Sequence, residues 1–238
     1  MIKNTAASVK TALKKIADPE RAKVLSGYFK TGAGEYGEGD IFIGIKTDQS
    51  RKVIKEHPRL TLSEIKKLIY GKVHEHRSAG WGILVNQYLK GDEKTKKKNY
   101  KFYLENCKQA NNWDLVDCSA PNLVGGYLMD HPGEKKTLYR LARSDNLWQR
   151  RIAIMATFPF IKRGKFEDTF KIAEILLNDQ HDLIHKAVGW MLREVGKIDQ
   201  KQEEVFLRKY CRRMPRTMLR YAIEKFDPEK RKFYMEKY

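Results

Sequence analysis

Helical periodicity, broken at regular intervals, is the feature that most constrains what this chain can fold into. Apolar residues recur at i, i+3 and i+4 through most of the sequence. The clearest stripe consists of Ile184, Ala187, Val188, Met191, Leu192 and Val195. Two further helix starts are visible at Asp18-Pro19 and at Ser63. Only residues 41–45 form a strand-like run, which is too short to build a sheet.

Turn-forming pairs such as Gly91-Asp92 and Asn178-Asp179 divide the chain into helices of roughly 10–16 residues. These helices pair into a repeat of roughly 35–40 residues, which is the size of a HEAT-type helical hairpin. Stacked hairpins bury one face and leave a concave surface. The sequence therefore predicts an all-α protein, an α-solenoid of HEAT-like helical hairpins with a concave basic face, forming a single domain over residues 1–238.

The charge is strongly positive along the whole chain. The 238 residues hold 48 Lys+Arg and 30 Asp+Glu, a net charge of +18. Residues 1–119 hold 23 basic and 14 acidic side chains, and residues 120–238 hold 25 and 16, so each half carries +9. A basic tail on a neutral domain would not give this even distribution. It indicates a long surface that faces a long polyanion.

Cysteine usage and the chain's start indicate a cytoplasmic protein with no membrane segment. Cys107, Cys118 and Cys211 are odd in number and form no CxxC pair, which is typical of reduced thiols. The start has no apolar signal core. The most apolar run, residues 152–161, is about half a bilayer span. His181 and His185 lack the acid of a zinc-protease pattern, so we expect neither a metal nor a cofactor.

A glycine-rich loop at residues 31–40 allows two interpretations. Its four glycines suggest a phosphate cradle, but Glu35, Glu38 and Asp40 would repel phosphate, and no Lys-Ser/Thr pair follows. A tight connection between helices that carries acidic side chains is the better account.

The segment from Asn112 to Pro121 places an acid beside an aromatic ring. Trp113 and Asp117 are spaced i, i+4 and share one helix face, whereas Asp114 points elsewhere. Pro121 removes an amide donor, so the helix should kink or restart there. Two roles remain open for Asp117: a hydrogen-bonded core acid, or an anion that stabilises positive charge beside a tryptophan.

Trp190 lies off the apolar stripe of its helix, on a basic side that also carries Lys186 and Arg193, two candidate DNA-binding residues. It either packs against the next repeat or offers an aromatic surface to a nucleobase or cationic ligand. Trp81, between two glycines, is expected in the core.

Several arginines are candidates for phosphate contact. Arg151 follows Asn146, which caps its helix, but that helix is apolar on several sides, so the pattern does not decide where Arg151 points. Two roles remain open for Arg151: it is exposed to solvent or paired with an acidic side chain, or it binds a DNA phosphate. A basic cluster near the C-terminus includes Arg216 and Arg220, and its arginines suit bidentate phosphate contact.

Three motifs together resemble the DNA alkylation repair family, the AlkD-like alkylpurine DNA glycosylases built of HEAT-like repeats. The motifs lie at residues 112–117 (Asn-Trp-Asp-Leu-Val-Asp), 144–151 (Ser-Asp-Asn-Leu-Trp-Gln-Arg-Arg) and 187–194 (Ala-Val-Gly-Trp-Met-Leu-Arg-Glu). Residues 34–40 and 214–222 also resemble family members, so the likeness covers nearly the whole chain in order.

The resemblance implies a DNA glycosylase that excises cationic N3- and N7-alkylated purines from double-stranded DNA. A solenoid that cradles DNA needs no partner subunit, so we expect a monomer. The resemblance also implies Asp117 as the catalytic carboxylate, Trp113 and Trp190 as aromatic residues that flank the lesion nucleotide, Arg151 as a backbone-binding arginine and Tyr28 as a further aromatic near the site. The alternatives are a non-catalytic HEAT-repeat DNA-binding protein and a protein-binding scaffold. The even positive charge argues against the scaffold.

Overall fold

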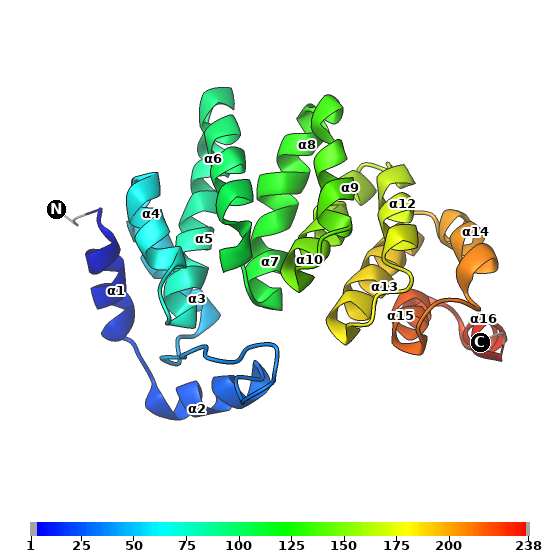
Figure 1. Ribbon diagram of the computed structural model, residues 1–238, viewed down its shortest axis with the longest axis horizontal. Coiled ribbons are helices and arrows are strands. Elements are labelled where there is room, and N and C mark those ends of the chain that lie inside the picture. Colours follow the sequence, from blue (N-terminus) through cyan, green and yellow to red (C-terminus); the bar gives the residue numbers. More distant parts are fainter. Residues whose placement is uncertain (1–3, 237–238) are drawn as a thin grey trace. The chain divides into compact units, whose positions relative to one another are not determined.

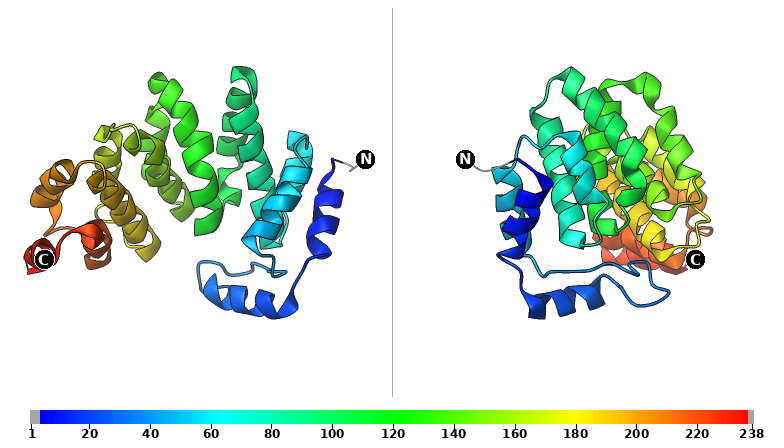
Figure 2. Two further views of the ribbon diagram at one scale, coloured as in Figure 1. Left: turned by 180° about the vertical axis from the view of Figure 1, so that it is seen from behind. Right: turned by 60° about the vertical axis from the view of Figure 1, so that its left-hand side comes forward.

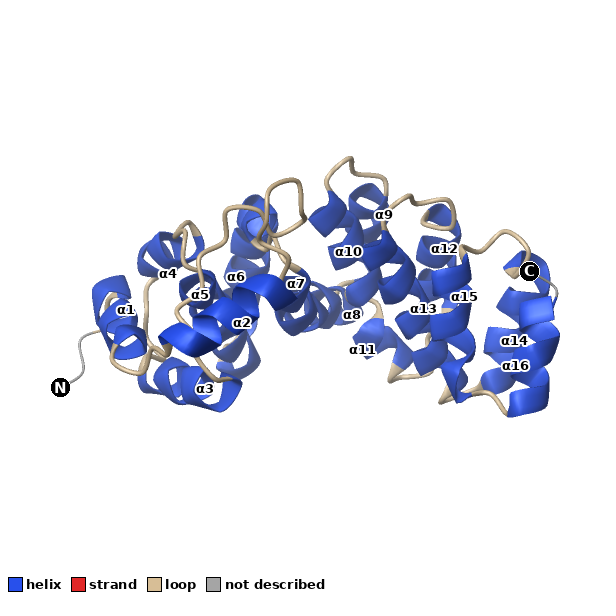
Figure 3. Ribbon diagram, turned by 90° about the horizontal axis from the view of Figure 1, so that it is seen from below, coloured by secondary structure: helices blue, strands red, loops and turns tan. Residues whose placement is uncertain are grey.

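The computed structural model describes residues 4–236, which form helices joined by loops (Figure 1). Residues 4–236 contain no strand, only an isolated bridge between Ile41 and Val73 (Figure 3). The all-α prediction is therefore confirmed. By its internal contacts the chain divides into two compact units, one up to Ser119 and one from Ala120. The single domain and the concave basic face remain predictions.

The first unit is built from helices that follow one another closely along the chain. Their bounds are α1 Ala6–Lys14, α2 Pro19–Tyr28, α3 Thr47–Glu56, α4 Leu62–Ile69, α5 His74–Lys90, α6 Glu93–Asn106, the 3-10 turn η1 Cys107–Gln109 and α7 Trp113–Ala120, whose last residue begins the second unit. Asp18 caps α2 as predicted. The cap of α4 is Thr61 and not Ser63, because the Thr61 hydroxyl accepts the amide proton of Glu64.

Helix α5 is the centre of the first unit. It packs against α1, α3, α4 and α6, so it buries more than one side. Trp81, Ile83 and Leu84 of α5 are buried, and the expected core position of Trp81 is confirmed. Neighbouring helices pack in sequence, α4 on α5 and α5 on α6, as in an α-solenoid.

Helix α2 lies crosswise to the other helices of its unit, at one end of them, and the loop after it runs back along the same end (Figure 2). None of the side chains of α2 belongs to the buried core. The loop reaches α3 through Gly44, whose backbone is left-handed at φ +83°. A side chain at Gly44 would also collide with the backbone of Asp18, so only glycine fits there.

The second unit consists of further short helices. Their bounds are the π-helix η2 Pro121–Gly126, α8 Tyr127–Asp130, η3 Pro132–Glu134, α9 Lys136–Ala142, α10 Leu147–Met155, α11 Phe158–Ile161, α12 Glu167–Ile175, α13 Asp182–Gly196, α14 Gln200–Tyr210, α15 Arg216–Ala222, η4 Ile223–Lys225 and α16 Pro228–Glu236. Helix α13 packs against α10, α14 and α15. Its predicted apolar stripe is confirmed, because the six residues named above are fully buried.

The helix changes character at Pro121, as predicted. Helix α7 ends at Ala120 and the chain continues directly as the π-helix η2. Proline has no amide proton to donate, which interrupts the α-helical hydrogen-bond ladder, and the wider π-turn accommodates the interruption.

None of the helices within residues 4–236 combines the length and the apolar character needed to span a membrane.

Candidate functional site

Helix α7 presents the predicted pair of Trp113 and Asp117 one helical turn apart. Both side chains are half-buried, while Val116 on the same face is completely buried. The side chain of Asn112 precedes the helix, and its Oδ1 accepts the amide proton of Trp113 at 2.8 Å. The pair is therefore fixed by a rigid helix and keeps access to solvent, as a site for a ligand requires.

An aromatic cluster surrounds Trp113. Phe29 stacks on the indole with ring centroids 5.0 Å apart and an interplanar angle of 9°. Tyr28 meets the same indole edge-on at 5.9 Å, and 63% of Tyr28 is exposed. The structure thus brings Tyr28 and Trp113 together, which the sequence did not establish, since α2 and α7 are far apart in the chain.

Cys118 follows Asp117 on α7 and belongs to an exposed residue position, but its thiol group is a poor nucleophile. Burial of its sulfur raises the pKa of the Cys118 thiol, and the charges of Asp114 and Asp117 raise it further. Because the thiolate is the reactive form, a raised pKa lowers the reactivity of this thiol near neutral pH.

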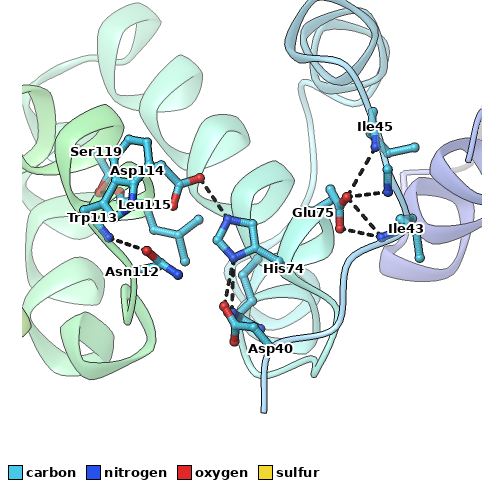
Figure 4. A network of polar contacts seen from close by, with 12 residues as sticks. Asp40, Ile43, Ile45, His74, Glu75, Asn112, Trp113, Asp114, Leu115 and Ser119 are labelled. Atoms are coloured by element: carbon cyan, nitrogen blue, oxygen red, sulfur yellow. Dashed lines mark hydrogen bonds and ion pairs between the residues drawn. The ribbon is translucent and has the colours of Figure 1, made fainter. Parts of the chain in front are cut away.

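Asp114 points away from Asp117, as predicted, and engages His74 at the start of α5. The His74 Nε2 lies 2.8 Å from Asp114 Oδ2, and its Nδ1 lies 2.9 Å from Asp40 Oδ2 (Figure 4). Asp40 ends the glycine-rich loop and also binds Arg77. Burial lowers the pKa of His74, but the hydrogen bonds to Asp114 and Asp40 outweigh it and raise the pKa to about 9.

The acids of the glycine-rich loop bind its own backbone amides. Glu35 accepts the amide proton of Gly32 at 2.9 Å, and Glu38 accepts that of Gly34 at 2.9 Å. Glu75 of α5 holds the end of the loop through the amides of residues 43–45 (Figure 4). This arrangement agrees with a structural connection, because carboxylates already occupy the amides that a phosphate cradle would need.

In the second unit, Trp190 is half-buried and tied to a buried acid. Its indole Nε1 donates to Glu194 Oε1 at 3.1 Å, one turn further along α13. Lys197 donates to the same oxygen at 2.5 Å, and Lys162 lies 3.8 Å from Oε2. The indole plane is therefore fixed by a hydrogen bond as well as by packing.

The comparisons with known proteins decide the family. The sequence matches the family of DNA alkylation repair enzymes over residues 9–226. The chain belongs to this family. Among solved structures, a chain described as a predicted DNA alkylation repair enzyme from Enterococcus faecalis superposes with a TM-score of 0.70 at 18% identity, covering 89% of this chain and 97% of that chain. At this identity the likeness shows the fold alone. None of the curated proteins matches the sequence.

Arg151 of this DNA alkylation repair family member is buried, whereas an arginine that binds the DNA backbone is normally accessible at the surface. Only 4% of the residue is exposed, and its guanidinium donates to the carbonyl oxygen of Leu183 at 2.5 Å. The guanidinium thus ties α10 to the first turn of α13. Its neighbour Arg150 pairs with Asp179 at 2.6 Å.

The other predicted DNA-binding cations differ in how far they are already paired. Lys186 lies 2.6 Å from Asp182, and Arg193 binds Glu224. Arg216 and Arg220 are exposed, and they line a pocket of about 140 Å³ together with Arg231, Ile223 and Met235. A pocket with three guanidinium groups is the part of the second unit best suited to an oxyanion.

Proposed function

We propose that this DNA alkylation repair family member is a DNA glycosylase that excises cationic N3- and N7-alkylated purines from double-stranded DNA. The proposal depends above all on Asp117, a partly exposed carboxylate one turn from Trp113 within a stretch of 119 residues that carries a net charge of +9. A protein that only binds phosphates gains nothing from an acid placed beside a partly exposed aromatic cluster.

The chemistry requires a negative charge and no general acid. An N-alkylated purine already carries a positive charge and leaves readily, so the barrier is the formation of an oxocarbenium-like deoxyribose. The Asp117 carboxylate stabilises that charge electrostatically and is able to orient or deprotonate the attacking water. A neutral purine would need protonation first, so the site selects cationic lesions.

The exposed aromatic rings bind the lesion nucleotide in this proposal. Trp113 and Tyr28 offer ring faces or edges to a cationic base or sugar, and attraction of a cation to an aromatic face is worth about 0.5–2 kcal/mol. That Trp190 contacts the same nucleotide stays a prediction from the resemblance.

In this proposal the exposed guanidinium groups of Arg216 and Arg220 make the main contacts with DNA phosphates. Arg216 and Arg220 are exposed and line one pocket together with Arg231, so three guanidinium groups face a bound phosphate from one place. Lys186 and Arg193 would exchange their partners Asp182 and Glu224 for phosphate, which weakens their contribution.

Base release from methylated duplex DNA tests the proposal. The purified protein is incubated with DNA that carries 7-methylguanine and 3-methyladenine, and free bases are quantified against DNA alone and against Trp113→Ala. We expect release well above the spontaneous rate, with a loss in the variant. Duplex binding without any release above that rate would instead indicate the non-catalytic DNA-binding protein.

A further inference from the structure

His74 joins two carboxylates that come from distant parts of the first unit. We propose that His74 is a positioning residue for the excision reaction: its ring donates to Asp40 and Asp114 at once and so holds the first turn of α7, with Trp113 and Asp117, in the reactive arrangement. This inference rests on the proposed function.

Two ionised carboxylates beside one imidazole call for a doubly protonated ring. An ionised carboxylate only accepts hydrogen bonds, so both ring nitrogens of His74 must donate, to Asp40 Oδ2 at 2.9 Å and to Asp114 Oδ2 at 2.8 Å. A neutral imidazole has one N–H group and therefore donates to only one of the two carboxylates. The residue is 2% exposed, so water does not replace the missing bond without opening the site.

Aromatic contacts give a second connection to the same helix. The His74 ring stacks on Phe42 at 4.4 Å and lies 5.0 Å from Phe29. Phe29 in turn stacks on Trp113. His74 therefore reaches α7 by two routes: through the carboxylate of Asp114 next to Trp113 (Figure 4), and through the ring of Phe29.

The charges around His74 set the pH range in which the connection holds. Asp40 faces it from the loop, Asp114 from α7 and Arg77 from α5, while two aromatic rings, those of Phe42 and of Phe29 directly after α2, complete its surroundings. Arg77 opposes protonation, but it binds the other oxygen of Asp40 and the carbonyl oxygens of Gly71 and Lys72. With a pKa of about 9, the His74 ring stays doubly protonated at neutral pH and loses one bond above pH 9.

The wild-type protein alone provides the first test. Histidine side-chain nitrogen NMR spectra from pH 6 to 10 report whether each ring is doubly protonated. We expect one histidine, assigned as His74 by its loss in His74→Gln, to keep both ring protons until about pH 9. If His74 titrates below pH 7, the proposal is overturned, whether or not the protein releases bases.

Variants provide the second test, with His76→Gln as the matched control on the same helix. Single-turnover release of 7-methylguanine should fall at least tenfold in His74→Gln and in Asp114→Asn, while duplex affinity and the melting temperature of Asp114→Asn change little. The double variant should lose no more than His74→Gln alone, because that change already removes the bond to Asp114. A loss in the control as large as in His74→Gln, or additive losses, would overturn the assignment.

The pH profile separates a positioning role from a purely structural one. After subtraction of spontaneous release at each pH, wild-type release should decline above about pH 9, and this decline should be absent from His74→Gln. A decline that persists unchanged in the variant would contradict the role of His74. If the wild type releases no base at any pH, the proposed function is refuted. The nitrogen titration then still tests whether His74 donates to both Asp40 and Asp114.

Discussion

Replacing Gly189 with alanine would place a methyl group where α13 and α15 meet. A Cβ at this position would lie 2.5 Å from the Cβ of Tyr221 and closer still to the carbonyl oxygen of Met218. Two carbon atoms pack best at about 3.5–4.0 Å, so α15 would have to move by about 1 Å. Because a backbone carbonyl is among the obstacles, rotation of a flexible side chain does not relieve the overlap.

The expected cost follows from the contact that would be disturbed. Overpacking of a core costs about 1–3 kcal/mol, and the backbone obstacle places Gly189→Ala at the upper end, about 3 kcal/mol. For a chain of this size that corresponds to a fall in melting temperature of about 6–12 °C. Thermal unfolding followed by circular dichroism measures it directly.

Gly27→Ala is the matched control for this prediction. Gly27 also lies within a helix, α2, but nothing lies within 4 Å of the position that a Cβ would take. Alanine there should raise stability by about 0.5–1 kcal/mol, because it restricts the unfolded chain. If Gly189→Ala melts at the wild-type temperature, the close approach of α13 and α15 is refuted.

Three further perturbations have defined outcomes. Burial raises the pKa of Glu203 to about 9, so the folded state retains a proton that the unfolded chain loses near pH 4.5, and stability falls as pH rises between these values. Because each pH unit above 4.5 costs about 1.4 kcal/mol, Glu203→Gln should be more stable than the wild type by about 5 kcal/mol at pH 8, and an unchanged pH dependence of unfolding would contradict this. Arg151→Ala should lower stability by about 2–3 kcal/mol through loss of the bond to Leu183. If Arg151 also contacts phosphate, as the sequence predicts, the salt dependence of duplex binding should flatten, and an unchanged slope would limit Arg151 to the structural role. Replacing both Arg216 and Arg220 with glutamine should lower the salt slope by about 2, and equal slopes would exclude their phosphate contacts.

Local patterns predicted the helices well. The stripe of α13, the cap at Asp18 and the break at Pro121 each depend on residues within a few positions of one another, and all three are confirmed. The start of α4 was misplaced by two residues, because Thr61 and Ser63 are equally good caps and only the hydrogen bond to Glu64 distinguishes them.

Long-range pairing could not be predicted from the sequence. His74 contacts Asp40, 34 positions before it, and Asp114, 40 positions after it, and no local pattern marks either pair. The direction of Arg151 was equally undetermined, because α10 is apolar on several sides. The bond between Trp190 and Glu194 is of a different kind, since the two residues are spaced i, i+4 on one helix.

The rate of base release by Asp117→Asn tests the central claim most directly. Asparagine keeps the size of the side chain and removes its charge, so duplex affinity should stay close to that of the wild type. Single-turnover release of 7-methylguanine should fall by about 10²–10³-fold, the usual loss when one stabiliser of transition-state charge is removed. Release at the wild-type rate by a variant that binds duplex DNA normally would contradict the role assigned to Asp117.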